Sequence, residues 1–278
     1  MATLSETDKD TPRQQEHQLT KDPEASNVEQ KVQDGSVQIY RTYEEYMKMD
    51  HKPRVYDMQK GICLIINMTI ERLGTDHDVK AIKNVFEDMN FIVVTETDGT
   101  KKQIKGALKK VARNEGAYDS VVCFILSHGD DDDMNATDGK LSFNTMFNIL
   151  KESMQLAGKP KIWFIQACRG GGIDELHSTD FEYEDSKHKI PIEADGLYVF
   201  STPRGYLSSR NAKDGTIFIQ TLCDILKKKE NRREKFLCLL PYLTDFIASK
   251  EIPIKDGRKM MQVIEFHSTL RGDLYFET

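Results

Sequence analysis

The stretch "IWFIQACRGGG" (162–172) places a mostly apolar, β-prone run directly before one cysteine, which an arginine and three glycines follow. An unbroken run of large apolar residues that ends at a glycine-rich turn is typical of a strand buried on both faces, as in parallel sheets. Ligands of such sheets bind at the carboxyl ends of the strands. The stretch therefore predicts an α/β fold with Cys168 at the edge where chemistry takes place.

The chain repeats this arrangement. Four further apolar runs predict buried strands at 61–67, 91–96, 119–127 and 196–201. Apolar residues at helical spacing lie between them, at 79–89, 104–111 and 143–150. Strands that alternate with helices of this length predict a mostly parallel sheet with helices on both faces.

The last third of the chain departs from this alternation. Two helices are predicted at 216–228 and 235–249, with a kink at Pro241 in the second. The stretch 261–268 alternates apolar and polar residues, which predicts a partly exposed edge strand.

Composition excludes several classes of protein. The net charge of −6 comes from 39 basic and 45 acidic residues without a basic block, which argues against a nucleic-acid surface. Residues 1–36 are polar and charged, which predicts a disordered tail without a secretion signal. No apolar run is long enough for a membrane span. We therefore expect a cytoplasmic protein that binds neither membranes nor nucleic acid.

The five cysteines are odd in number and widely spaced, and no C-x-x-C occurs. Both a disulfide framework and a structural metal site are therefore poor interpretations, and we expect no metal and no cofactor. Four cysteines, which lie within predicted strands or helices, are expected to be small buried hydrophobic residues: Cys63, Cys123, Cys223 and Cys238.

Two predicted strands end in reactive side chains. The run 119–127 leads into His128 and Gly129, and the run that opened this section leads into Cys168. An imidazole can take the proton of a thiol and later protonate a leaving amine, which is what cysteine acyl transfer requires. Backbone N–H groups near a glycine can stabilise an oxyanion. From these residues alone, catalysis and a buried structural cysteine are about equally well supported.

A wider set of segments resembles the caspase family. "QACRG" (166–170) is similar to the family's signature around its cysteine, with a histidine upstream. The other similar segments, which together cover roughly residues 55–278, are "GICLIIN", "RLGTDHDV", "ILSHGDD", "KPKIWFIQACRG", "HKIPIEAD", "RNAKDGTIFIQ" and "LYFET". The resemblance implies the caspase fold: a six-stranded, mostly parallel sheet with helices on both faces and an antiparallel edge strand at a dimer interface.

The resemblance implies roles for individual residues. Cys168 corresponds to the nucleophile and His128 to the acid/base, while the N–H groups of Gly129 and Cys168 would bind the oxyanion. The carbonyl of Ile70 would orient the histidine. The aspartate pocket of a protease that cuts after aspartate would consist of Arg72, Gln166 and Arg210, because guanidinium groups bind carboxylates in a bidentate manner.

The substrate groove departs from the family's usual residues. Leu207, Ser209 and Ile217 stand where aromatic residues usually line the groove beyond the aspartate pocket, so peptide affinity there is expected to fall. In "STPRGY" (201–206) an arginine, rather than the usual proline, directly precedes the glycine.

The resemblance also implies processing and partners. The expected segments are a prodomain (1–36), a large subunit (37–174), a cleavable linker (175–187) and a small subunit (188–278). The expected cleavage sites are Asp34, Asp185 and Asp180. The short prodomain resembles that of executioner caspases in apoptosis. Partners would be protein substrates cut after aspartate, a second copy or a related caspase paired through 261–268, and inhibitor-of-apoptosis proteins.

Two alternatives remain to the aspartate-specific protease. One is a weakly active or decoy caspase-like regulator that forms heterodimers with an active relative, which the altered groove favours. The other, a metacaspase-like protease for basic residues, would need acidic groups where Arg72 and Arg210 stand.

Overall fold

The structure is a computed structural model that describes residues 54–169, 191–206, 208, 213–253 and 259–277. These residues fall within one compact unit, 52–278. The predicted tail, linker and three cleavage sites lie outside the described residues, as do Leu207, Ser209 and Arg210.

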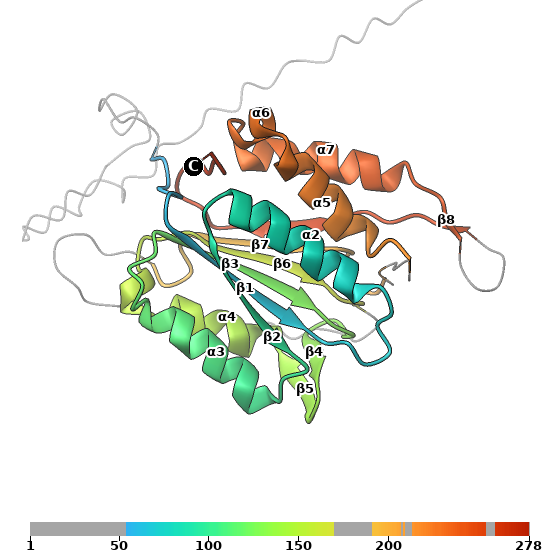
Figure 1. Cartoon of the computed structure of the whole chain (residues 1–278), viewed down its shortest axis with the longest axis horizontal. Coiled ribbons are helices and arrows are strands. Elements are labelled where there is room, and N and C mark those ends of the chain that lie inside the picture. Colours follow the sequence, from blue (N-terminus) through green and yellow to red (C-terminus); the bar gives the residue numbers. More distant parts are fainter. Residues whose placement is uncertain (1–53, 170–190, 207, 209–212, 254–258, 278) are drawn as a thin grey trace, which may run out of the picture. The chain divides into compact units, whose positions relative to one another are not determined.

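Six strands form one sheet in the order β10-β7-β6-β3-β1-β2 (Figure 1). Their bounds are β1 (Gly61–Asn67), β2 (Ile92–Thr97), β3 (Ser120–Leu126), β6 (Lys161–Gln166), β7 (Gly196–Phe200) and β10 (Glu265–Ser268). All neighbours are parallel except β10, which runs antiparallel to β7 at the edge. The predicted fold class, a mostly parallel six-stranded sheet with an antiparallel edge strand, is confirmed.

The four central strands are buried along their whole length. Strands of a parallel sheet that is covered on both faces need apolar residues along their whole length, and these strands have them. The prediction of a buried strand at 91–96 was wrong about burial, because β2 is the last strand on its side and Ile92 is 52% exposed. The predicted strand 261–268 was too long, since among its residues only Glu265–Ser268 pair with β7.

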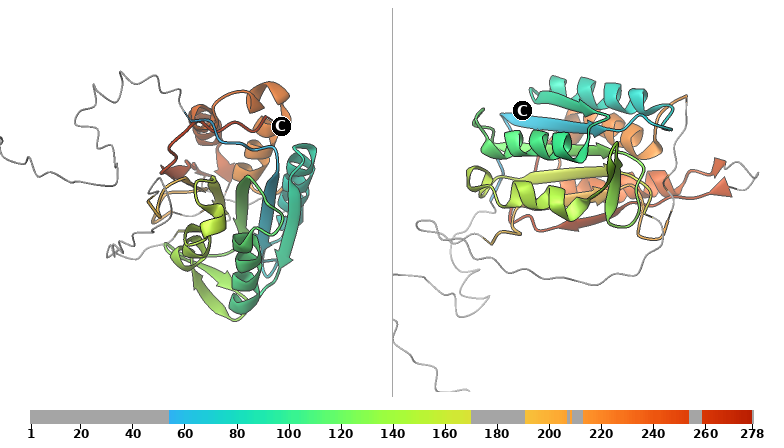
Figure 2. Two further views of the ribbon diagram at one scale, coloured as in Figure 1. Left: turned by 90° about the vertical axis from the view of Figure 1, so that its left-hand side faces the viewer. Right: turned by 90° about the horizontal axis from the view of Figure 1, so that it is seen from below.

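Helices cover both faces of the sheet, as predicted (Figures 1 and 2). One layer consists of α2 (Thr75–Asp88), α5 (Ile217–Lys227), the short α6 (Lys229–Arg232) and α7 (Phe236–Ala248), and the other of α3 (Lys101–Arg113), α4 (Phe143–Lys151) and a 3-10 turn, Met154–Leu156. Each layer encloses a separate hydrophobic core against the sheet. In the first core Phe86 packs edge-on against Phe124, and in the second Phe147 packs against Trp163.

Local signals explain where several helices begin. The Thr100 side chain accepts a bond from the N–H of Gln103, whose side chain bonds the N–H of Thr100 in return, which starts α3. Thr216 caps α5 in the same position, accepting from Ile219. The apolar helix α7 continues through Pro241 as one helix.

Two hairpins were not predicted. β4 (Asp133–Ala136) and β5 (Gly139–Ser142) form the first, and β8 (Ile252–Pro253) and β9 (Lys259–Met260) form the second. The first follows His128 directly, and the N–H of Asn135 donates to the carbonyl of His128. It therefore supports the loop in which the histidine lies.

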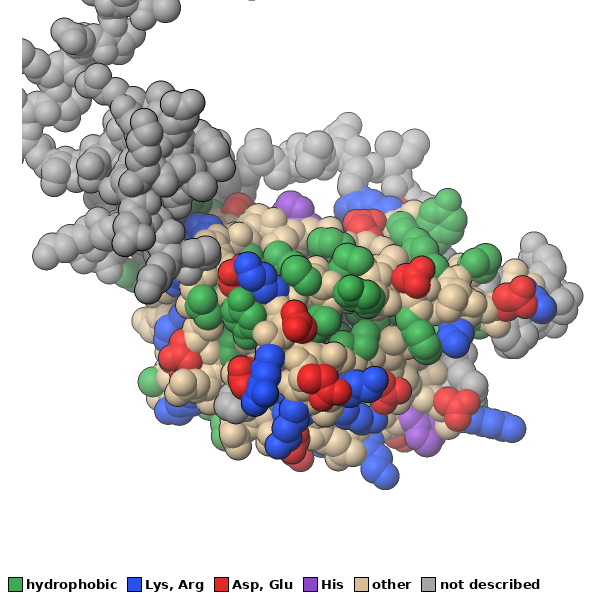
Figure 3. Space-filling model, turned by 90° about the horizontal axis from the view of Figure 1, so that it is seen from above, with side chains coloured by type: hydrophobic (Ala, Val, Ile, Leu, Met, Phe, Trp, Pro, Cys, Tyr) green, Lys and Arg blue, Asp and Glu red, His purple; other side chains and the backbone are tan. Residues whose placement is uncertain are grey.

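None of the helices in the described part of the chain is long and apolar enough to cross a bilayer. Figure 3 views the molecule from the side of α7, where hydrophobic and charged side chains are interspersed. The large apolar residues of α7 that are exposed are Tyr242 and Phe246.

Candidate active site

The register of the sheet brings the two reactive strand ends together. β3 and β6 are parallel neighbours in which Leu126 lies opposite Gln166. His128 and Cys168 each follow two residues after this pair. The pairing continues beyond the strands, because the N–H of Ser127 donates to the carbonyl of Gln166 at 3.2 Å. His128 and Cys168 therefore lie at corresponding positions on the same edge of the sheet.

Gly129 marks how closely these two ends approach. A Cβ atom at this position would lie 2.5 Å from the carbonyl oxygen of Asp133, 3.2 Å from the Cβ of Ala167 and 3.4 Å from the carbonyl oxygen of Cys168. Real Cβ atoms do not approach a backbone oxygen this closely. The close approach accounts for a glycine directly after the histidine.

The imidazole of His128 has a backbone partner. Its Nε2 lies 3.3 Å from the carbonyl oxygen of Glu71, so a proton on Nε2 would leave Nδ1 able to accept a proton. The predicted partner, the carbonyl of Ile70, is wrong by one residue. Glu71 has a φ of 56°, a left-handed backbone that a non-glycine residue adopts at a cost.

Cys168 differs from the three buried cysteines. Its side chain is partly exposed, and its Sγ lies 4.0 Å from the carbonyl oxygen of Ser208. Burial raises the pKa of the other three thiols, so they stay protonated at neutral pH: Cys63, Cys123 and Cys223. The prediction that Cys238 is buried was wrong, because it lies on the exposed face of α7.

Two of the three predicted pocket residues are described, and they lie together. Arg72 is 2% exposed, and its Nη1 lies 3.5 Å from the carbonyl oxygen of Gln166. The side-chain Nε2 of Gln166 donates to the hydroxyl of Ser208 at 2.5 Å, and that hydroxyl donates to Ser201 at 2.9 Å. The amide nitrogen carries two hydrogens, and Ser208 accepts one of them.

The residue after the nucleophile is tied to two other segments. The N–H of Arg169 donates to the carbonyl of Tyr206, and the guanidinium lies 4.0 Å above the ring of Phe200. Its Nη1 forms an ion pair with Glu265 of β10 at 3.0 Å. Arg169 is almost fully buried, so this cation needs the partner that the edge strand provides.

The segment 201–206 is also tied to the loop after the histidine. Asp131 accepts from the N–H of Gly205 at 3.2 Å, and Asp132 accepts from the guanidinium of Arg204 at 2.6 Å. The arginine that replaces the family's usual proline thus has a structural partner. Sequence reasoning missed these residues, although the acidic run directly after "SHG" was a visible signal.

No group of three or more histidine, cysteine and carboxylate side chains that could hold a metal occurs among the described residues. Ile217, which replaces an aromatic residue of the groove, begins α5 and packs partly buried against the first core.

Comparison with known proteins gives a consistent result. The caspase domain matches residues 60–275. Caspase-3 of Felis catus is 32% identical over 268 residues, which cover 90% of this chain and 94% of that protein. Caspase-3 of Mesocricetus auratus is 35% identical over 79% of this chain and 80% of that protein. Caspase-3 of Bos taurus is 36% identical over 69% of this chain and 72% of that protein. Because the caspase domain matches residues 60–275, which is most of the chain, the chain belongs to the caspase family.

Proposed function

We propose that this chain is a cysteine endopeptidase that cuts proteins after aspartate in apoptosis. The observation that carries the proposal is the meeting of His128 and Cys168 at one edge of the sheet, beside Arg72 and Gln166. A thiol and an imidazole supply the acyl-transfer chemistry, and a buried arginine with an amide donor supplies a site for one carboxylate.

The reaction follows from these groups. His128 takes the proton of the Cys168 thiol, and the thiolate attacks the carbonyl carbon of the peptide bond after aspartate. The negative charge passes to the carbonyl oxygen, where the N–H groups of Gly129 and Cys168 would bind it. His128 then protonates the leaving amine, and a thioester remains. Water, with its proton taken by His128, hydrolyses the thioester and restores the thiol.

Specificity for aspartate would come from Arg72, Gln166 and Arg210. Two guanidinium groups and one amide match the geometry of a short carboxylate, and a neutral asparagine in its place would offer the buried Arg72 no charge partner. Each such mismatch costs on the order of 3–5 kcal/mol, which is more than a hundredfold in affinity.

Peptide cleavage tests the proposal. The wild-type chain should cut a fluorogenic peptide that has aspartate before the scissile bond. It should cut the matching asparagine peptide at least a hundredfold more slowly. Cys168→Ala should abolish cleavage, while Cys238→Ala, which replaces an exposed cysteine remote from this edge, should leave it unchanged. If no aspartate peptide is cut by a folded chain after cleavage at Asp185, the proposal is wrong.

We further propose that the chain is made as a zymogen and cut at Asp185 or Asp180, with Asp34 as the prodomain site. The arrangement of the sheet supports this, since β6 and β7 pair directly on either side of 170–190 and need no intact connection. Mass spectrometry after incubation with an active caspase would identify the cut.

Two kinds of partner remain predictions from the resemblance. One is a second copy or a related caspase paired along β10, and the other is an inhibitor-of-apoptosis protein.

The alternative function is regulatory: a weakly active or decoy caspase that forms heterodimers with an active relative. Two features favour it. The Gln166 amide, which would bind the aspartate, already donates one of its two hydrogens to Ser208, and Ile217 stands where the resemblance implies an aromatic residue of the groove. Adding Cys168→Ala protein to an active caspase separates the two functions. A regulator would still change the partner's activity, and a protease would not.

A further inference from the structure

Helix α3 carries a concentration of positive charge that the reaction above does not use. Its 13 residues include no acid and six cations, which are Lys101, Lys102, Lys105, Lys109, Lys110 and Arg113. All six are exposed or partly exposed, because the apolar residues of the helix are the ones that face the second core. The helix therefore has a charge of +6 within a chain whose net charge is −6.

Four of these cations follow one another at a spacing of four residues. Lys101, Lys105, Lys109 and Arg113 form what we call the α3 ridge, since residues four apart are neighbours on a helix surface. Like charges at this spacing destabilise a helix. Lys101 and Lys102 also lie in the first turn, at the positive end of the helix dipole. The arrangement is therefore unfavourable for the chain on its own.

The lysines of α3 form no ion pair with any residue that the structure describes, and Arg113 pairs with Glu115 at 3.3 Å, where both side chains are largely exposed. The segment 227–235 also contains six cations, but several of them have acidic partners. These pairs are Arg232 with Asp88, Arg233 with Glu277, and Lys235 with Asp273. The charge of α3, in contrast, is open to a partner from outside.

The α3 ridge begins at the end of the sheet that carries the candidate active site. α3 follows the carboxyl end of β2, which runs in the same direction as β1 and β3. A Cβ atom at Gly139 would lie 3.4 Å from the Nζ of Lys101, so the ridge starts beside the β4–β5 hairpin that follows His128. From there α3 runs along the outside of its layer, next to α4 (Figures 1 and 2).

The surroundings of the ridge favour a narrow partner. Acidic side chains lie at both of its ends, because Asp138 accepts from the N–H of Lys101 at 2.7 Å and Glu115 pairs with Arg113. A flat anionic bilayer or a nucleic-acid duplex would meet these acids together with the lysines, whereas a single chain that follows the helix axis meets mainly the lysines.

The residue types of α3 point the same way. The structure describes the whole of this helix, and none of the exposed large apolar residues belongs to it. It thus offers no apolar side chain that would insert into a membrane and no aromatic ring on which a base would stack.

We propose that the α3 ridge is a docking site for an extended acidic segment of a partner protein. Carboxylates placed along the ridge would offset the repulsion between its cations. At 1.5 Å per residue the ridge is about 18 Å long, which an extended segment of about five or six residues spans. The proposal concerns a surface outside the thiol, the imidazole and the aspartate pocket, so it does not depend on the proposed protease activity.

Peptide binding tests the proposal. A fluorescein-labelled peptide of alternating glutamate and serine, which has no aspartate to be cut, is titrated with the full chain at low salt, and anisotropy gives its Kd. We expect this peptide to bind and the matching peptide of glutamine and serine not to bind. Added salt should weaken the binding, because it screens exposed charges.

A triple variant tests whether the ridge is the site. Lys101→Gln, Lys105→Gln and Lys109→Gln together remove three unpaired charges and keep residues of similar helix propensity. Because an exposed ion pair changes an affinity about twofold, we expect the three substitutions to weaken binding roughly tenfold. The variant should unfold at the same urea concentration as the wild type or at a higher one, since like charges have been removed from the helix.

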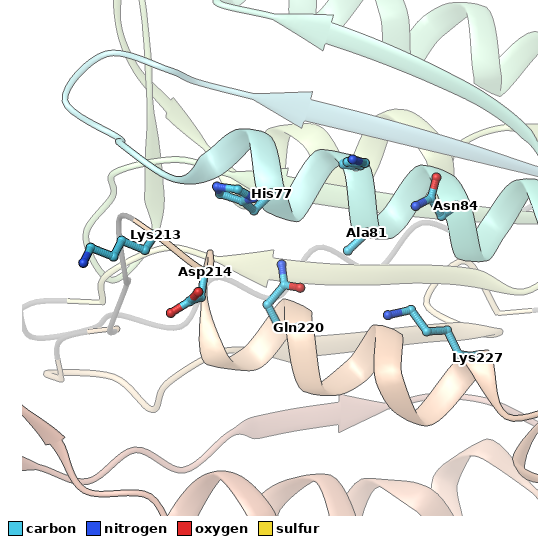
Figure 4. Close-up of a pocket in the computed structure, with 8 residues that line it drawn as sticks. His77, Ala81, Asn84, Lys213, Asp214, Gln220 and Lys227 are labelled. Carbon is cyan, nitrogen blue, oxygen red and sulfur yellow. The ribbon is translucent and has the colours of Figure 1, made fainter.

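The matched control removes three lysines from another basic part of the surface. A hollow of about 560 Å³ between α2 and α5 is lined by Lys80, Lys213 and Lys227, and Figure 4 shows two of them with Asp214. Lys227 pairs with Asp224 at 2.7 Å, so this region already contains acids. Changing the three lysines to glutamine gives the same net charge as the ridge variant, and we expect the Kd to stay within about threefold of the wild type.

Three outcomes would overturn the proposal. The first is an equal loss of affinity in the two triple variants, which would mean that only net charge matters. The second is a ridge variant that binds the glutamate peptide as the wild type does, or a glutamine peptide that binds equally well. The third is tighter binding of single-stranded oligothymidylate, or of vesicles containing phosphatidylserine, that the ridge variant loses, which would assign the ridge to nucleic acid or to anionic lipid.

Discussion

Gly129 is the residue at which the spacing of the two reactive strand ends is most directly tested. A methyl group there would meet the backbone oxygen of Asp133, which cannot move without disturbing the loop after His128. We expect Gly129→Ala to lower kcat for an aspartate peptide about a hundredfold, because a displacement near 1 Å is enough to misalign a thiol and an imidazole. Stopped-flow or plate-based cleavage kinetics would measure this.

Gly106→Ala provides the control. Gly106 lies inside α3, and a Cβ there would meet nothing within 4 Å. Alanine should therefore raise the free energy of unfolding by about 0.5–1 kcal/mol and leave kcat unchanged. If Gly129→Ala behaved like Gly106→Ala in both measurements, the close approach of the strand ends would not matter for catalysis.

Residue by residue, the sequence predicted the chemistry of the site better than its supporting contacts. Cys168 and His128 follow continuous apolar runs, so their place at strand ends could be read from hydrophobicity alone. The partner of the histidine could not, because hydrophobic patterns do not show whether the carbonyl of Ile70 or that of Glu71 faces the ring. The bonds of Ser208 to Gln166 and of Asp78 to Thr216 join segments far apart in the chain, and no local pattern marks them.

At the scale of elements, the start of β7 is held by a buried ionic group. Asp195, which is fully buried, accepts from the hydroxyl of Tyr56 at 2.6 Å and from two nitrogens of Arg271 at 3.0 and 2.7 Å. Burial acts to raise the pKa of Asp195, but the bonds from Arg271 and Tyr56 outweigh it and hold that pKa below its usual value. The group joins three segments at the edge of the sheet opposite the active site.

We expect Asp195→Asn to lower the free energy of unfolding by about 1–3 kcal/mol at pH 7, because it removes the charge partner of Arg271, whose side chain is 36% exposed and so partly solvated. A carboxyl with a lowered folded-state pKa contributes stability above its unfolded pKa, near 3.9, and loses it as pH falls through the folded pKa. Urea unfolding should therefore show the wild-type and variant curves converging below about pH 4. A difference that stayed constant well below that pH would contradict the ionic role.

Most of the helices and strands could be predicted from the sequence. Six strands and five main helices follow from hydrophobic periodicity, and their bounds are correct within a few residues for β1, β3 and β6. Periodicity could not show that β2 is an edge strand, since an edge strand and a central strand with the same apolar run differ only in their neighbours. The hairpin of β4 and β5 was missed because its four-residue strands contain charged and small residues.

For the whole molecule, the pairing of β6 with β7 predicts how the chain behaves after it is cut between them. β6 and β7 lie on either side of 170–190, and their parallel pairing joins the two parts through a common core. We expect protein cut at Asp185 to elute from a sizing column as one species and to unfold in a single urea transition. Separation of the two fragments without denaturant would show that the uncut connection, rather than the sheet, holds them together.

The pH dependence of stability is also a property of the whole molecule, and two kinds of buried group affect it in opposite directions. Three buried thiols have raised pKa values, so stability falls as pH rises above about 8.5, where thiols of the unfolded chain ionise. Lys161 has the opposite effect. Its Nζ is buried and donates to the carbonyls of Lys159 and Leu156, and burial lowers its pKa to about 8, against the attraction of Asp195.

A lysine with a lowered folded-state pKa contributes stability above its unfolded pKa and loses it as pH falls through the folded pKa. Stability from Lys161 therefore rises between pH 8 and about 10.4 and partly offsets the loss from the thiols. Lys161→Met removes this rise and leaves the thiols unchanged, so the variant should be the more stable protein at pH 7.5. Its advantage over the wild type should shrink by on the order of 1–2 kcal/mol by pH 9.5 in urea unfolding. An advantage that stayed constant over this range would mean that Lys161 titrates as an exposed lysine does, and that its burial in the sheet has no influence on the stability of the whole chain.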